Sequence, residues 1–391
     1  MRISHVAGRS FPLEGPPPSQ PPPRRSRRAI GLIIAALVLL AAFLVAGPYI
    51  SSALNQGYSI LSGSSNTGAG TVGPSTGGSN GTSSIITSTS CSSVVSAKAL
   101  AAPDIKNGTA DVSYPPDYCT LADYALGLIN QDRASNGSSP VTLAYNQAGQ
   151  QHADSMLYYG YFSHFDTQGY KPYMRYTLLG GVGAVFENVA SATYSRPHFA
   201  TTDDAKAALK VLEWSMMYND TVCCGNGHRT NILNPLHDRV SVGVAYNSTT
   251  LFLDEDFENY YVNMSVTTSN SSAVTMRGQV LDPSIHPSEA FVAYDGPPVS
   301  ETPTQLNLGP RDYGAGLIIG GVLPPCSSAC PTFSEGITVH ASHWEFTPKE
   351  MKVSFSLALF IQEYGAGVYT IYFVTGSDTD SAITSFSIFV G

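Results

Sequence analysis

An unbroken run of apolar residues and glycine from Ala29 to Ala46 constrains this chain more than any other stretch. At about 1.5 Å of rise per residue, a helix continued to Ile50 just spans the apolar core of a bilayer, which is about 30 Å thick. Four arginines directly precede the run, and no Lys or Arg occurs from Ala29 to Ala97. Because positive residues mark the cytoplasmic flank, the sequence predicts a transmembrane helix at 29–50 with a cytoplasmic N-terminus. The rest of the chain is then extracytoplasmic.

A cleaved secretory signal is the alternative interpretation of the same run. The run is longer than the apolar region of a usual signal peptide, and no clear small-x-small cleavage site follows it. We favour an uncleaved anchor in the cell membrane, and cleavage stays open. A buried core helix is the weakest interpretation, because nothing in the run is polar enough to face water.

Composition agrees with export and excludes two classes of protein. The 43% of hydrophobic residues exclude disorder throughout. The net charge is −9, and the first 28 residues carry six Arg and one Glu (+5), which leaves −14 for the remainder. Such an acidic ectodomain is a poor nucleic-acid binder. Outside a membrane, Asn-x-Ser/Thr acceptors predict a glycoprotein. Seven asparagines begin such an acceptor: Asn80, Asn107, Asn136, Asn219, Asn247, Asn263 and Asn270.

Six cysteines in an oxidising compartment predict up to three disulfides, although sequence alone allows fifteen pairings. Cys326 and Cys330 are the clearest pair, since they lie close together in a Pro-rich loop with no other cysteine near. Cys91 and Cys119 are candidates to tie a linker to the first domain.

Cys223 and Cys224 are adjacent in sequence and precede His228 by a few residues. They allow three interpretations: a vicinal disulfide, partners for the two N-terminal cysteines, or thiolate metal ligands. Outside the cell we rank a disulfide above a metal.

The chain divides into five segments by composition. Residues 1–28 read as a disordered, Pro-rich cytoplasmic tail before the helix at 29–50. A linker rich in Ser, Gly and Thr, at 51–115, has too few large apolar residues to fold. Two folded domains follow, predicted at 116–268 and 272–391.

Apolar spacing in the first domain predicts three helices and a pair of strands, an α+β fold. The helices are expected from Thr120 to Gly137, from Asn146 to Tyr159, and after Thr201 or Thr202. His152 falls on the apolar stripe of the second helix, which predicts a structural buried histidine. The strands are expected at Val240–Tyr246 and Leu251–Leu253.

The second domain shows only strand patterns, which predict an immunoglobulin-like sandwich. The longest alternating stretch places Met351, Val353, Phe355, Leu357 and Leu359 on one face. The predicted strands are Val274–Val280, Phe291–Tyr294, Leu317–Leu323, Ile337–Phe346, Met351–Phe360, Val368–Val374 and Ile383–Val390.

Candidate site residues lie in three short motifs of the first domain: Phe162–His164, Glu187–Ala190 and Gly227–Pro235. Two imidazoles and one carboxylate, from His164, His228 and Glu187, could together hold zinc or another divalent metal. Alternatively, the histidines only hydrogen-bond within a polar cluster, and Glu187 orients a histidine or acts as a general base.

Six motifs in order resemble the CAP superfamily of cysteine-rich secretory, antigen 5 and pathogenesis-related proteins (SCP domain), in its prokaryotic branch. The resemblance covers about Tyr118 to Ser265. It implies an α-β-α sandwich with a central cleft lined by His164, Glu187 and His228, where some members bind a divalent metal. The motifs are Leu128–Arg133, Gln151–Ala153, Phe162–His164, Glu187–Ala190, Gly227–Pro235 and Val242–Val244.

The chain departs from the better known eukaryotic pattern at two positions. That pattern has a second acidic residue three positions after the helix tryptophan, and counting from Trp214 gives Met217, which cannot bind a hard ion. Glu213 lies one turn earlier and could substitute, but we favour a solvated surface carboxylate. Phe186 replaces the usual glycine before Glu187.

Three function hypotheses follow. The first is a membrane-anchored binding or scaffold module whose cleft holds a divalent metal and a peptide, lipid-like or cell-envelope ligand. The second is a zinc-dependent, protease-like hydrolase at the cell surface with Glu187 as the catalytic base. The third is an adhesive cell-wall module in which the cleft has no role. Because Met217 removes an acid from the cleft, a non-enzymatic role is favoured.

Overall fold

The computed structural model describes residues 2–7, 91, 115–144, 146–269, 272–310 and 312–391. Among these residues, no helix is both long and apolar enough to cross a membrane. The predicted transmembrane helix at 29–50 lies outside the described residues, as does the linker at 51–115 apart from Cys91 and residue 115.

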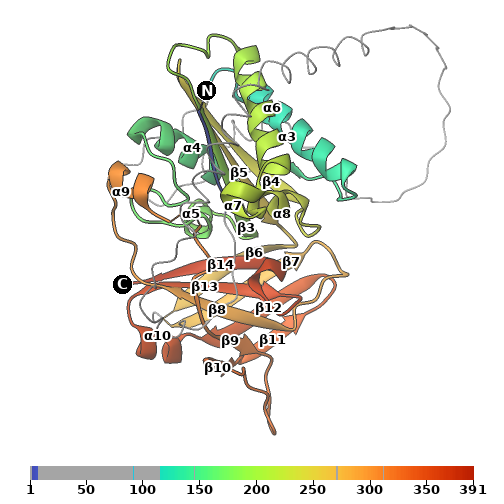
Figure 1. The fold of residues 1–391 in the computed structure, drawn as a ribbon. Coiled ribbons are helices and arrows are strands. Elements are labelled where there is room, and N and C mark those ends of the chain that lie inside the picture. The colour runs from blue at the N-terminus through green and yellow to red at the C-terminus, as the bar shows by residue number, and fades with distance from the viewer. Residues whose placement is uncertain (1, 8–90, 92–114, 145, 270–271, 311) are drawn as a thin grey trace, which may run out of the picture. The chain divides into compact units, whose positions relative to one another are not determined.

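The first domain is built on a mixed five-stranded sheet in the order β1-β3-β5-β4-β2. Figure 1 labels its strands β3, β4 and β5. Neighbouring strands are antiparallel except β2 and β4, which are parallel. The strands are β1 (Arg2–Ala7), β2 (Thr142–Leu143), β3 (Ala184–Thr193), β4 (Arg239–Tyr246) and β5 (Thr250–Asn259). The helices are α3 (Tyr118–Ser135), α4 (Ala148–Tyr159), α5 (Pro172–Leu178), α6 (Thr202–Tyr218), α7 (Thr221–Cys224) and α8 (Gly227–Leu233).

Helices cover both faces of this sheet, as expected for an α-β-α sandwich. One face of β5, with Leu253 and Phe257, shares a core with α3 and α6. The other face, with Phe252, packs against Met156 of α4. Helix α4 approaches β4 so closely that a Cβ atom on Gly243 would lie 2.1 Å from the Gly149 carbonyl oxygen. This close approach explains why glycine stands in the Val242–Val244 motif.

Local signals placed the three long helices correctly. Thr201 forms a capping box with Asp204 at the start of α6. Gly160 ends α4 in the left-handed conformation, with φ of 73°. The buried Arg133 fixes the end of α3, because its guanidinium donates hydrogen bonds to the Ile232 carbonyl at 2.6 Å and the His237 carbonyl at 3.1 Å.

Strand β1 corrects the prediction that the first 28 residues lack structure. Its six residues pair antiparallel with β3, from Arg2 opposite Thr193 to Ala7 opposite Asn188. Backbone pairing requires both strands in one compartment. A membrane crossing at 29–50 would separate β1 from β3, so an anchored chain with a cytoplasmic N-terminus cannot have β1 paired.

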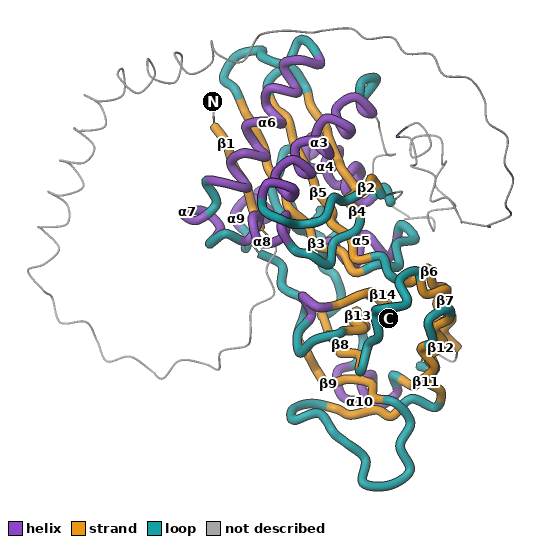
Figure 2. Tube along the Cα trace, turned by 90° about the vertical axis from the view of Figure 1, so that its right-hand side faces the viewer, coloured by secondary structure: helices purple, strands orange, loops and turns teal. Residues whose placement is uncertain are grey.

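The second domain consists of two sheets, ordered β10-β9-β8-β13-β14 and β11-β12-β7-β6, which Figure 2 shows as separate layers. Apolar side chains of both sheets, such as Met276 and Ile371, share one core. Strand β10 runs parallel to β9, which departs from the all-antiparallel immunoglobulin pattern that we predicted. The strands are β6 (Val262–Ser269), β7 (Ala273–Val280), β8 (Glu289–Asp295), β9 (Leu317–Leu323), β10 (Ile337–His340), β11 (His343–Phe346), β12 (Glu350–Ser356), β13 (Gly367–Val374) and β14 (Ala382–Val390).

Three boundaries in this domain differ from prediction. Strand β6 pairs with β7, so the domains meet before Val262 and not at residue 268. The predicted strand Ile337–Phe346 is broken into β10 and β11. The predicted strand Met351–Phe360 ends at Ser356, whose hydroxyl accepts a hydrogen bond from the Ala358 amide at 3.2 Å. Helix α10 (Ala358–Tyr364) follows, and the short 3-10 helix η2 (Thr379–Ser381) precedes β14.

The segment between β8 and β9, residues 296–310 and 312–316, packs on the first domain; we call it the β8–β9 connection. Its helix α9 (Pro303–Leu308) inserts Leu306 among the apolar side chains of α4 and Phe162. Asn307 accepts a hydrogen bond from the Phe162 amide at 2.9 Å and donates one to the Gly160 carbonyl at 3.2 Å. The second domain therefore covers the motif that contains His164.

The six cysteines form three disulfides, Cys91–Cys119, Cys223–Cys224 and Cys326–Cys330. The pairing of Cys326 with Cys330 is as predicted. Of the alternatives left open for the other four, the structure has the vicinal disulfide and the link to the first domain.

Candidate functional site

Glu187 of β3 is the centre of a fully buried polar cluster. One carboxylate oxygen, Oε1, lies 2.7 Å from His164 Nδ1, and the other, Oε2, lies 3.1 Å from His152 Nδ1. Arg175 donates a short hydrogen bond to Oε2. The Glu187 backbone amide donates to the hydroxyl of Tyr313, in the β8–β9 connection, at 3.0 Å. The structure therefore places His164 in contact with Glu187, together with three further partners, His152, Arg175 and Tyr313.

Strand β5 adds further carboxylates to the same face of the sheet. Asp256 lies directly opposite Glu187 in the strand register, and Asp254 lies opposite Val189, two residues along β3. Asp254 Oδ2 is 3.0 Å from His152 Nδ1. The prediction that His152 is buried is correct, but its role is wider than packing. It contacts two carboxylates, and Arg175 Nη2 lies 2.8 Å from its Nδ1 atom.

Burial and Arg175 together set the charges of this cluster. Burial alone would raise the pKa of Glu187, but Arg175 and His152 outweigh it and hold that pKa well below its usual range. Burial, with repulsion from Glu187, raises the pKa of Asp254 and Asp256 well above the ordinary value. Burial and Arg175 lower the pKa of His152 to about 4. At neutral pH the central pair is therefore an ionised Glu187 beside a charged Arg175, with a neutral His152.

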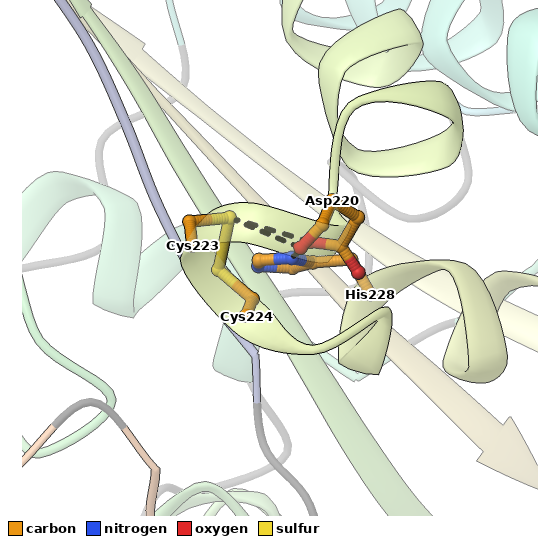
Figure 3. A group of neighbouring side chains, drawn as sticks. All are labelled: Asp220, Cys223, Cys224 and His228. Carbon is orange, nitrogen blue, oxygen red and sulfur yellow. Dashed lines mark hydrogen bonds and ion pairs between the residues drawn. A yellow bond between two sulfur atoms is a disulfide. The ribbon is translucent and has the colours of Figure 1, made fainter. Parts of the chain in front are cut away.

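His228 does not join Glu187. It lies in the first turn of α8, and its Nδ1 atom lies 2.5 Å from Oδ1 of Asp220, the residue before α7 (Figure 3). Among the described residues, two groups bring metal-capable atoms within 4.8 Å of one another, and the predicted trio of His164, Glu187 and His228 is not one of them. The groups are His152 with Glu187 and Asp254, and Asp220 with Cys223, Cys224 and His228. The carboxylate that contacts His228 is that of Asp220, eight residues earlier in the chain.

Glu213 and Met217, where the chain departs from the eukaryotic pattern, are both buried. Met217 is buried in the core between α3, α6 and the sheet. Glu213 is only 2% exposed, so the expectation of a solvated surface carboxylate is wrong. It faces Glu255 of β5, and burial with this neighbour raises the pKa of Glu213 well above its usual value. Burial also raises the pKa of Glu255 to about 7.

Sequence reasoning missed Arg175, Asp220, Asp254, Asp256 and Tyr313. One signal was available: Asp254, Glu255, Asp256 and Glu258 crowd one short strand between apolar residues, and all four are buried. Arg175 and Tyr313 carried no local pattern that singled them out.

A cavity of about 110 Å³ opens beside Glu187, where the first domain meets the β8–β9 connection and β13. The ring of Tyr313 forms part of its wall and lies edge-on to His164, with 4.9 Å between ring centroids. Four aromatic rings line the cavity, together with the polar side chains of Thr230, Asn231, Asn234, Thr379 and Asp380. The rings belong to Tyr173, Phe186, Tyr313 and Tyr372.

Comparison with known proteins agrees with this fold. The model of the cysteine-rich secretory protein family, CAP, matches residues 126–264. The first domain of this chain is a CAP domain, which confirms the resemblance seen in the motifs. A solved structure of an extracellular protein containing an SCP domain, from Bacillus anthracis str. Ames, is 20% identical over 38% of this chain, with a TM-score of 0.27. The match spans 45% of that protein, less than half of its length. No curated protein matches the chain.

Proposed function

We propose that the chain is an exported CAP-domain module that binds a peptide at the cavity beside Glu187 and catalyses no reaction. The observation that carries the proposal is the state of Glu187. Both of its carboxylate oxygens are engaged, by His164, His152 and Arg175.

A general base needs a free lone pair and a pKa near the working pH. Glu187 lacks the second, because its pKa is well below the ordinary value, and three partners already occupy most of its lone pairs. It acts instead as an anchor that fixes α4, α5 and the loop of His164 to β3. This role supports a binding module over a hydrolase.

The cavity supports a ligand with a small aromatic or apolar group. Its volume of about 110 Å³ is the space of a few water molecules or of one side chain. Rings at its wall favour edge-to-face or offset contact with another ring. The side-chain NH2 of Asn234, whose oxygen accepts from the Leu236 amide, can donate to a peptide carbonyl beside that ring. We therefore favour a peptide that inserts an aromatic side chain over a lipid-like or other cell-envelope ligand.

A zinc ion at His152, Glu187 and Asp254 is the second candidate, favoured by the convergence of their ligand atoms within 4.8 Å. Arg175 argues against it, because its guanidinium contacts two of these three residues and already supplies the positive charge. The site does not fit an ion while Arg175 is in place. The proposed function therefore involves no metal at these three residues.

The test uses p-cresol, the isolated side chain of tyrosine, as the probe of the full-length chain in detergent. Saturation-transfer NMR should detect cresol binding to the wild type. Ala315→Phe, which fills the cavity, should abolish it, and Leu308→Phe, at an exposed residue of α9, should not. Hydrolysis of a casein substrate is measured in parallel, with and without added zinc. Equal cresol binding by wild type and Ala315→Phe would overturn the binding proposal, as would casein cleavage that disappears in Glu187→Gln.

A further inference from the structure

The second metal-capable group, Asp220 with Cys223, Cys224 and His228, lies apart from the Glu187 cluster and has different chemistry (Figure 3). Each of the four residues offers one ligand atom, and these atoms all lie within 4.8 Å of one another. Cys223 Sγ is 3.5 Å from Asp220 Oδ1, the same oxygen that lies 2.5 Å from His228 Nδ1. Two sulfurs, one imidazole and one carboxylate thus converge within nine residues of sequence.

A tight turn between α7 and α8 creates this convergence. Gly225 and Asn226 both have left-handed backbones, with φ of 58° and 69°, which reverses the chain after the cysteines. Thr221 Oγ1 donates a hydrogen bond to Asn226 Oδ1 at 2.7 Å and holds the turn. The second carboxylate oxygen of Asp220 accepts from the Arg229 amide at 3.2 Å. The carboxylate and the imidazole are therefore fixed before any ion arrives.

The four residues Asp220, Cys223, Cys224 and His228 differ in solvent exposure. His228 is 0% exposed and Asp220 only 1%, whereas Cys223 is exposed and Cys224 half-buried. A reductant in solution can therefore reach the disulfide, while the buried imidazole and carboxylate keep their positions. Attack of an external thiolate on an accessible sulfur is the ordinary route of disulfide reduction.

We propose that the Cys223–Cys224 disulfide is the oxidised form of a redox-gated zinc site completed by His228 and Asp220. In the reducing step, a dithiol reductant attacks one sulfur and leaves as its own disulfide. The Cys223–Cys224 bond takes up two electrons and two protons and becomes two thiols. Zinc then displaces both thiol protons, which pass to solvent, and binds the two thiolates, the imidazole and the carboxylate.

The four ligands favour zinc, or another ion that binds thiolates well, over magnesium or calcium. Two thiolates with an imidazole and a carboxylate suit tetrahedral zinc, at about 2.3 Å from each sulfur. That geometry separates the sulfurs by about 3.8 Å, so the S–S bond must break before the ion can enter. Outside the cell the disulfide is the resting form, and the site therefore opens only when a dithiol reductant is present.

The test compares the oxidised full-length chain with the same chain reduced by dithiothreitol and desalted without oxygen. Cobalt(II) serves as the probe, because thiolate ligation gives a charge-transfer band and tetrahedral geometry strengthens the visible bands. We expect one cobalt ion with both signatures per reduced chain, none in the oxidised chain, and displacement of the cobalt by zinc. Asp220→Asn should weaken this binding roughly 10- to 100-fold.

Two matched double variants test whether the cobalt binds at Cys223 and Cys224. Cys223→Ser with Cys224→Ser should abolish the thiolate–cobalt band, and Cys326→Ser with Cys330→Ser, which removes another exposed disulfide, should leave it unchanged. Absence of the band in the reduced wild type overturns the proposal. Its persistence in the first variant, or its loss in the second, does the same. The comparison of oxidised with reduced wild type tests the zinc site even if a variant fails to fold. Its result does not depend on whether the chain binds cresol.

Discussion

Replacing Arg175 by methionine should strongly destabilise the CAP domain although it leaves the apolar core intact. Arg175 is buried, and its Nη1 atom donates to the His164 carbonyl at 2.7 Å and to the Tyr170 carbonyl at 2.9 Å. Its Nη2 atom neutralises Glu187. Methionine fills most of the volume but supplies neither the charge nor the donors.

The magnitude follows from these contacts. Removing one partner of a buried ion pair costs about 3–5 kcal/mol, because the remaining charge stays out of water. Two carbonyls also lose a charged donor, at about 1 kcal/mol or more each, and partial relaxation offsets part of this. We expect a loss of about 4 kcal/mol at pH 7. That loss is a large share of the 5–15 kcal/mol by which domains are typically stable.

The assay is urea unfolding of full-length protein, followed by the fluorescence of Trp214 in a Trp344→Phe background. The chain has two tryptophans, and Trp214 lies on α6 while Trp344 lies on β11, so this background reports the CAP domain alone. Arg229→Met is the matched control. Arg229 is half-buried and donates to the Met217 carbonyl and to Asn136, so its loss should cost no more than about 1 kcal/mol.

The pH dependence gives a second check. The folded pKa of Glu187 is depressed, so its ion pair contributes stability above the unfolded pKa of about 4.5, and this contribution is lost as the pH falls below that value. The difference between wild type and Arg175→Met should therefore shrink in acid. A difference below about 1 kcal/mol at pH 7 would refute the reasoning.

Three further predictions test other parts of the structure. Burial raises the pKa of Glu258 to about 8, so the folded state loses stability as the pH rises from about 4.5 through 8. Glu258→Gln should therefore gain stability relative to wild type across that window, by up to about 1.4 kcal/mol per pKa unit. Equal pH profiles of the two proteins in urea titrations would contradict this. Tyr313→Phe removes the acceptor of the Glu187 amide and should cost about 1–2 kcal/mol in thermal unfolding, whereas Tyr158→Phe, at an exposed tyrosine, should cost nothing measurable. Because β1 pairs with β3, an N-terminal epitope tag should be accessible to antibody on intact cells, and an inaccessible tag would show that residues 29–50 cross the membrane instead.

The CAP fold was predictable because its signals are local. The capping residues of α6 and the glycine after α4 mark helix ends by backbone chemistry alone. Strand β3 escaped prediction because nine of its ten residues are buried or half-buried, and a strand covered on both faces loses the alternation of polar and apolar residues. Strand β6 was assigned to the wrong domain, because only its pairing with β7 shows where it belongs.

The candidate site was predictable in part. The motifs named both His164 and Glu187, and the fold of the domain places the loop of His164 beside strand β3. The partner of His228 depended on the left-handed backbones of Gly225 and Asn226, two residue types that tolerate this conformation without fixing which way the chain turns. Tyr313 comes from 126 residues after Glu187, in another domain, and no spacing rule within the CAP motifs reaches that far.

The β8–β9 connection makes the two folded domains unsuitable for separate study. A fragment ending at Ser269 would lose Asn307 and Tyr313, and with them the acceptors of the Phe162 and Glu187 amides. It would also uncover the apolar patch that Leu306 shields. Expression of the CAP domain alone should give an aggregation-prone, poorly soluble product. Gene fusions or domain exchanges among related proteins therefore need to transfer both domains together.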